Sequence, residues 1–231
     1  MKIFIGWDSR EPEAYDVCKF SIERHASRPV EIIPLKQTEL RESGLYTREK
    51  GMMESTEFSL TRFLVPKLCN YEGVALFLDC DILIQDDITK VLEVIPPEAD
   101  SPYHCPAVWA TQHNYKPKNE MKFLDQYNST YPKKNWSSFM LFNNAKCKAL
   151  TPEYVNSVTG LMLHRFWWLE NENEIGSIPL EWNWLVGEYA LNPEAKGLHY
   201  TLGGPWFEGY KDCDHADLWF AERDKMLAAK S

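Results

Sequence analysis

Two aspartates one residue apart, Asp79 and Asp81, are the residues whose types and spacing best fit a chemical role. They interrupt an apolar run, with residues 73–78 before them and residues 82–84 after them. In a buried strand, residues i and i+2 point to the same side, so both carboxylates would face one point. Adjacent buried carboxylates are costly unless a cation neutralises them, and hard divalent cations prefer oxygen ligands. The segment predicts a metal site, although an acid pair that only caps a turn fits the same residues.

The same Asp-Cys-Asp tripeptide recurs at residues 212–214, where the neighbouring residues are polar and indicate a loop before a helix. The tripeptide alone is therefore weak evidence for a site. The first copy differs because its apolar neighbours indicate a fully buried strand with the acids at its carboxyl end. Ligands of open α/β sheets bind at that end of the strands.

Length and composition favour one globular α/β domain over residues 1–231. The hydrophobic share of 44% and the charged share of 26% are typical of a soluble protein. A formal net charge of -9 argues against nucleic acid or an anionic membrane as the main partner. The aromatic content of 13% would suit sugar rings, although most such residues belong to cores.

Cysteine spacing and the amino-terminal residues bear on the compartment. The six cysteines form no CxxC pair, so we expect reduced thiols and neither a zinc knuckle nor a disulfide framework. The first residues reach an acid, Asp8, after a short apolar stretch, which is unlike a signal peptide or anchor. No apolar run approaches the length of a membrane span. We therefore predict a cytoplasmic protein.

Alternating strand and helix patterns are expected to position the acids. Strands are predicted at residues 2–6, 30–35, 73–84, 107–110, 138–142 and 198–201, and helices from residue 12, at 58–68, 181–191 and 215–229. Residues 36–56 lose the apolar period and read as a long surface loop, often a lid or binding segment. We assign Asp86 and Asp87 to the capping of a helix rather than to chemistry.

An arginine-bearing helix, an apolar strand ending in Asp-x-Asp, and a late His-x-x-x-Gly-x-Pro-Trp segment at residues 199–206 follow one another in this chain. This order resembles the family 8 glycosyltransferases, the group of glycogenin and the bacterial lipopolysaccharide galactosyltransferases. The resemblance implies a GT-A (Rossmann-like) α/β fold, with a mixed, mainly parallel sheet and helices on both faces. It also implies a divalent metal (usually Mn²⁺, with Mg²⁺ as the second choice), a nucleotide-sugar donor (usually a UDP-sugar), a saccharide or other hydroxyl acceptor, and retention at the anomeric carbon.

The resemblance also assigns roles to residues. The implied metal ligands are Asp79, Asp81 and His199, with Asp79 also near the ribose; the implied donor-binding residues are Gly6, Trp7, Asp8, Asp79, Cys80, Gly203 and Gly204. Glycines let backbone N–H groups approach a phosphate closely. A lone histidine is more often structural than a ligand. Arg62, the arginine of the helix, is expected beside the acids, with a surface salt bridge as the alternative.

Three positions depart from the pattern of that family. Residues 136–139 are Trp-Ser-Ser-Phe where the family commonly has Phe-Asn-Ala-Gly, and residues 181–183 are Glu-Trp-Asn where it has Asp-Gln-Asp. Gly204 stands where the family has a lysine before the Pro-Trp pair. We assign Glu181, Arg62 and Asn183 to the catalytic group, with Glu181 gripping sugar hydroxyls or steadying the oxocarbenium-like centre.

A metal-dependent glycosyltransferase is thus the predicted function, and other classes remain open. A metal-dependent nucleotidyltransferase would normally carry a glycine-rich, lysine-bearing loop after the first strand, which residues 6–10 lack. A haloacid-dehalogenase phosphatase would need Asp-x-Asp on the first strand followed by Thr or Val, where this chain has Leu83. A non-catalytic nucleotide- or sugar-binding module is the alternative from outside the enzymes.

Overall fold

The computed structural model describes residues 1–49, 51, 54–96 and 105–230, and within them the central sheet has six strands. In spatial order these are β2 (Glu31–Leu35), β1 (Lys2–Gly6), β3 (Val74–Leu78), β8 (Phe139–Asn143), β5 (Val108–Thr111) and β9 (Ile175–Ile178). β8 is antiparallel to both of its neighbours, whereas the other pairings are parallel. The sheet is therefore mixed and mainly parallel, as the resemblance implied.

The central strands form where the sequence has apolar runs. In β3 every residue after Val74 is buried, and β8 is buried up to its last residue, because layers of helix cover both faces. A second sheet orders β10 (Trp184–Leu185), β11 (Gly197–His199) and β4 (Ile82–Ile84), and a small hairpin joins β6 (Met121–Lys122) to β7 (Gln126–Tyr127). The second sheet and the hairpin bring distant parts of the chain toward the end of β3.

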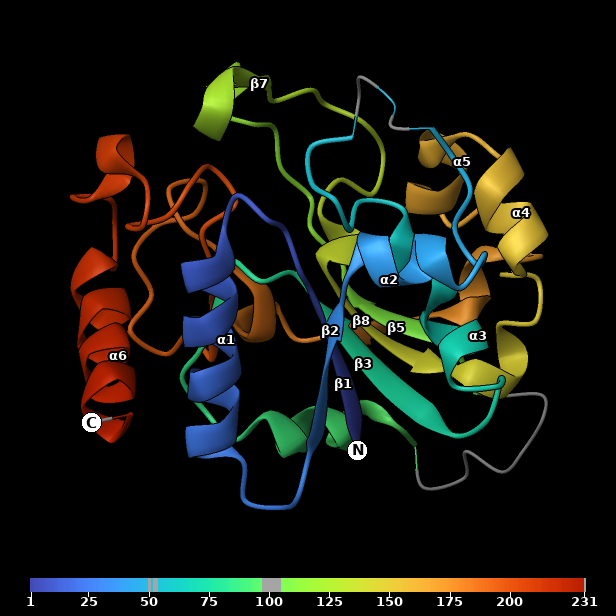
Figure 1. Ribbon diagram of the computed structural model, residues 1–231, viewed down its shortest axis with the longest axis horizontal. Helices are drawn as coiled ribbons and strands as arrows, with labels where there is room; N and C mark the ends of the chain where they lie inside the picture. Colours follow the sequence, from blue (N-terminus) through green and yellow to red (C-terminus); the bar gives the residue numbers. More distant parts are fainter. Residues whose placement is uncertain (50, 52–53, 97–104, 231) are drawn as a thin grey trace.

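Helices flank the central sheet on two sides (Figure 1). They are α1 (Pro12–His25), α2 (Gln37–Glu42), α3 (Val65–Leu68), α4 (Pro152–Ser157), α5 (Gly160–His164) and α6 (Ala216–Ala229). Short 3₁₀ helices cover Thr61–Leu64, Ile88–Val94, Phe123–Asp125, Trp136–Ser138, Asn144–Lys146, Glu172–Glu174, Leu180–Asn183 and Glu208–Tyr210. α1 and α6 lie side by side, joined by the Arg24 and Glu222 ion pair, while α3, α4 and α5 lie across the sheet from them (Figure 1). In the part of the chain that is described, no helix is long and apolar enough to cross a bilayer.

Most predicted elements are confirmed, and Asp87 caps a 3₁₀ helix by accepting from the Thr89 backbone N–H. The predicted single strand over residues 73–84 is wrong, because β3 ends at Leu78 and β4 belongs to the other sheet. The chain turns between them, since a continuous strand would carry both acids into the sheet.

Three further predictions need correction. The predicted helix 181–191 is instead a 3₁₀ turn followed by β10, because β10 pairs with β11 and uses its backbone groups there. The predicted helix 58–68 is reduced to Thr61–Leu64 and Val65–Leu68, and Pro66 has no N–H to continue one helix through it. The predicted loop 36–56 contains α2, and its residues 50, 52 and 53 lie outside the described residues.

Candidate active site

Asp79 and Asp81 lie in the turn that leaves the central sheet at the end of β3. The Asp79 backbone N–H donates to the Ser138 carbonyl at 2.9 Å, which fixes the turn to the start of β8. The Asp81 carbonyl accepts from the Tyr200 N–H at 3.0 Å, which fixes its other end to the residue after β11. The carboxylates therefore converge through these contacts and not through strand alternation.

His199 reaches the acids through the pairing of β11 with β4. His199 is opposite Ile82, the residue that follows Asp81, so the antiparallel ladder places the imidazole beside the turn. His199 is 2% exposed, and its Nε2 lies 3.3 Å from Asp81 Oδ1. That carboxylate oxygen is buried and has no hydrogen-bond partner among the described residues. Two buried groups thus face each other without a bond that satisfies both.

Asn183 selects the tautomer of the His199 imidazole. The Ser138 hydroxyl donates to the Asn135 carbonyl and accepts from Asn183 Nδ2 at 2.9 Å, so the Asn183 amide oxygen faces His199 Nδ1 at 2.8 Å. In the neutral imidazole Nδ1 then carries the proton, and the lone pair of Nε2 lies on the side of Asp81. Asn183, predicted from sequence as catalytic, is fully buried behind His199 and positions it.

Asp79, Asp81 and His199 fit a divalent cation. Each offers one ligand atom, and the three atoms lie within 4.8 Å of one another; no other such group occurs in the described residues. Two carboxylates favour Mn²⁺ or Mg²⁺, and the imidazole is presented in its ligating tautomer. Burial raises the pKa of Asp79 to about 6, and the charge of Asp81 adds to the shift.

Asn183→Leu is expected to weaken Mn²⁺ binding about 10- to 100-fold, because His199 loses the acceptor that fixes its tautomer. Asn183→Asp is the matched control, since a carboxylate accepts the same Nδ1 proton and should preserve the affinity. Titration of Mn²⁺ followed by electron paramagnetic resonance measures both. Equal Mn²⁺ affinities of the leucine and aspartate variants would contradict the role of Asn183 in positioning His199.

Arg62 is a buried partner of Asp79. Its Nη1 donates to Asp79 Oδ1 at 2.7 Å and to the Ser137 carbonyl at 2.8 Å, and its Nε donates to the Ser59 carbonyl at 3.1 Å. The guanidinium also lies 4.9 Å from the centre of the Phe77 ring. The side chain is only 6% exposed, so the surface salt bridge considered from sequence is excluded.

A cavity of about 720 Å³ opens over these groups, and Arg62, Asp79, Asp81 and His199 all line it. Its other walls come from the hairpin of β6 and β7, the turn before β8, and the start of α5. This volume is in the range of small-molecule sites. Four of the residues predicted from sequence, Arg62 and the three candidate metal ligands, therefore line one concave surface.

The remaining predicted residues are not among the described residues that line this cavity: Gly6, Trp7, Asp8, Cys80, Glu181, Asn183, Gly203 and Gly204. Asp8 is fully buried and bound by Arg10, whose side chain helps to lower the pKa of Asp8 against the effect of burial. Burial raises the pKa of the Cys80 thiol, so it stays protonated inside the protein. A Cβ at Gly6 would lie 2.4 Å from the Phe58 ring, which gives this glycine a packing reason.

Several polar residues near the acids were not singled out from sequence. Lys122, Lys134 and His164 line the cavity, and the Ser137 hydroxyl lies 2.7 Å from His164 Nδ1. Burial lowers the pKa of His164 to about 3, so it is neutral at physiological pH. These residues come from a lysine-rich connection and a short helix with no motif, so spacing gave no signal for them.

Glu11 is a buried acid behind the site. Its side chain makes no capping hydrogen bond to α1, although Glu11 precedes that helix directly. Instead it accepts from Trp206 Nε1 at 3.2 Å. Burial raises the pKa of Glu11 to about 8, and the charges of Asp81 and Asp8 add to the shift.

Glu11→Gln is expected to stabilise the metal-free protein at high pH. The folded protein holds the Glu11 proton up to about pH 8, whereas the unfolded chain releases it near 4.5, so the wild type loses stability as pH rises between these values. Glutamine removes this loss, on the order of a few kcal/mol at pH 8.5 and close to zero at pH 4. Urea unfolding at both pH values measures it, with Glu13→Gln on the exposed side of α1 as control. A stabilisation independent of pH would contradict the assignment.

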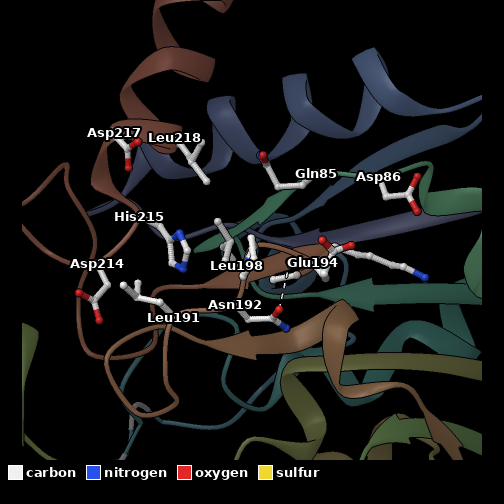
Figure 2. A pocket seen from close by; sticks show the side chains of 13 residues that line it. Gln85, Asp86, Leu191, Asn192, Glu194, Leu198, Asp214, His215, Asp217 and Leu218 are labelled. Atoms are coloured by element: carbon white, nitrogen blue, oxygen red, sulfur yellow. Dashed lines mark hydrogen bonds between the residues drawn. The ribbon is translucent and has the colours of Figure 1, made fainter.

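A second groove, of about 830 Å³, lies at the start of α6 (Figure 2). Asp214, His215 and Asp217 approach it from the α6 side, and Asn192 and Glu194 from the loop before β11 (Figure 2). Asp214 belongs to the second Asp-Cys-Asp copy, which lies in turns as predicted and joins no three-ligand group in the described residues. The volume of a groove alone therefore does not identify the candidate metal site.

Comparisons with solved structures agree with the mixed, mainly parallel α/β fold described above, and a comparison with curated proteins finds one relative of similar length. The chain is 48% identical to the Arabidopsis thaliana protein CDI over 231 residues, covering 97% of this chain and 86% of that protein. A scan against protein-family models found no match. Among solved structures, the bifunctional glycosyltransferase WbbM superposes with a TM-score of 0.62 and 15% identity over 96% of this chain and 49% of WbbM. The galactosyltransferase LgtC in complex with donor and acceptor sugar analogues superposes with a TM-score of 0.54 and 12% identity over 97% of this chain and 96% of LgtC. The chain thus spans about half of WbbM, and its fold is that of GT-A glycosyltransferases.

Proposed function

Since this chain belongs to the family of the Arabidopsis thaliana protein CDI and has a GT-A glycosyltransferase fold, we propose that it is a metal-dependent glycosyltransferase. It would move a hexose from a nucleotide-sugar, in the first instance a UDP-sugar, to a hydroxyl group of a saccharide or other acceptor. The observation that carries the proposal is the convergence of Asp79, Asp81 and His199 at the wall of a cavity of about 720 Å³.

The three ligands would hold Mn²⁺ or Mg²⁺, whose chemistry is to neutralise charge on the diphosphate of the donor. Arg62 holds Asp79 in place, and Asn183 orients His199, so the ligands are set before any substrate arrives. Such preorganisation aims fixed charges at the place where charge develops in the transition state. We place the donor-binding role of Gly6, Trp7, Asp8, Cys80, Gly203 and Gly204, and the sugar-binding role of Glu181, in the same proposal.

The transfer itself breaks the bond between the anomeric carbon and the β-phosphate oxygen, and the electron pair leaves with the diphosphate. The acceptor oxygen forms the new bond to the anomeric carbon, and its proton passes to a phosphate oxygen of the leaving group. Attack from the side of the leaving group gives retention and needs no separate protein base. We propose that residues 1–231 carry this chemistry as a single domain.

A screen of nucleotide-sugars by thermal shift, with and without Mn²⁺, tests the proposal. A ligand that binds the native state raises the melting temperature. At a ligand concentration 100 times Kd, the gain in the free energy of unfolding is about 2.7 kcal/mol. We expect a shift with a UDP-sugar that requires the metal. Slow release of the free sugar without acceptor would then separate an enzyme from a binding module. No metal-dependent shift with any nucleotide-sugar would overturn the proposal.

A further inference from the structure

Lys122 is a lysine of the cavity whose Nζ lies 5.5 Å from the centre of the Phe123 ring. It lines the cavity together with Asp79 and Asp81, yet its amine has no hydrogen bond or ion pair with any residue that the structure describes. Burial lowers the pKa of Lys122, while the carboxylates of Asp81 and Asp79 oppose that shift. Holding an ammonium group in a partly buried place without an acceptor is costly, so this arrangement suits an anionic ligand.

The hairpin of β6 and β7 holds Lys122 against the segment that follows β11. The Phe123 N–H donates to the Leu202 carbonyl at 2.8 Å, and the Phe123 ring stacks on Phe207 with 5.2 Å between ring centres. Gly203 has φ +128, and a Cβ there would lie 3.0 Å from Phe123 Cβ. Glycine thus allows the turn and the close approach together. Lys122 is consequently held next to the turn that follows His199.

The neighbouring Gly204 cannot supply a cation. A Cβ at this position would lie 2.0 Å from the Trp206 ring. Trp206 is fixed from several sides, since its Nε1 donates to Glu11 and its ring packs against Tyr200 and Trp219. The position at which those glycosyltransferases carry a lysine is therefore occupied by an indole ring in this chain, whereas Lys122 brings an ammonium group into the cavity from another element.

We propose that Lys122 binds the diphosphate of the donor and offsets the negative charge that the diphosphate gains when the sugar leaves. This inference rests on the proposed glycosyltransferase function. When the glycosidic bond breaks, the electron pair passes to the β-phosphate oxygen, so the diphosphate gains one negative charge. An ammonium group at a charged phosphate oxygen makes a charge-assisted hydrogen bond, about twice as strong as a neutral one. Lys122 then acts together with the metal and not as a metal ligand.

Calorimetric titration of UDP and of UMP, each with Mn²⁺, tests the role of Lys122. We expect Lys122→Ala to weaken UDP binding about 10-fold or more and UMP binding much less, because the Lys122 ammonium group would contact the second phosphate, which UMP lacks. Lys122→Arg should retain most of the UDP affinity, and Lys122→Gln replaces the alanine variant if that variant does not fold. Lys118→Ala, which removes an equal charge from an exposed residue bonded to the Gly187 carbonyl, is the control.

The outcomes separate the two proposals. If the wild type binds UDP with Mn²⁺ but Lys122→Ala and Lys122→Gln bind it equally well, the role of Lys122 is overturned and the proposed function stands. If the wild type binds neither UDP nor another nucleoside diphosphate in the presence of Mn²⁺, both proposals fall. Equal losses in the Lys122 and Lys118 variants would show a general charge effect and would also overturn the assignment.

Discussion

Asp81→Asn is expected to abolish Mn²⁺-dependent binding of a nucleotide-sugar, with a loss in affinity of about 100-fold or more, since a ligand is lost outright. Asp81 Oδ1 is buried, has no hydrogen-bond partner in the part of the chain that is described, and faces His199 Nε2 at 3.3 Å, so it is placed where it could bind a cation together with His199. An amide keeps the shape of the side chain but removes its charge. Calorimetric titration of a UDP-sugar with and without Mn²⁺ measures the effect.

The same substitution should not unfold the protein. The charge of Asp81 helps to raise the pKa of Asp79, so asparagine relieves repulsion in the metal-free state. His199 also lowers the pKa of Asp81, so asparagine gives up that favourable interaction as well, and we expect a melting temperature close to that of the wild type without metal. Asp214→Asn, at the same position of the exposed second Asp-Cys-Asp copy, is the matched control and should bind as the wild type does. Retained binding by Asp81→Asn, or an equal loss in Asp214→Asn, would contradict the metal site.

Arg62→Met is expected to destabilise the protein by about 3–5 kcal/mol, because it leaves the Asp79 carboxylate in a buried place without its partner. It also removes the donors to the Ser137 and Ser59 carbonyls. Methionine preserves much of the apolar contact with Phe77, so the loss reports on charge and hydrogen bonds. For a chain of this length the melting temperature should fall by about 10 °C. Chemical unfolding gives the free energy directly.

A double-mutant cycle with Asp79→Asn isolates the ion pair. Once Asp79 is neutral, Arg62→Met leaves no unpaired carboxylate, so its cost should shrink by about 0.5–3 kcal/mol. A cost for Arg62→Met that is the same in both backgrounds would assign the effect to the carbonyl contacts of Arg62 and would contradict a structural ion pair.

The local pattern of the sequence was sufficient for the elements that carry the site. Apolar runs predicted β1, β3, β5 and β8, because a strand buried on both faces shows its burial in its own residues. The helix predicted over residues 181–191 failed for the opposite reason. There the pairing of β10 with β11 outweighs the apolar period, and the partner lies outside the segment.

The sequence by itself determined the Asp-x-Asp at the end of β3 and, through a resemblance, the identity of His199 as its companion. Only the tertiary structure decided that the acids converge in a turn, that Asn183 fixes the His199 tautomer, and that Lys122 enters the same cavity. The physical reason is the range of the interactions involved. Burial and periodicity act between neighbours and can be read along the chain, whereas hydrogen-bond direction and the field of a charge depend on residues that the fold brings together.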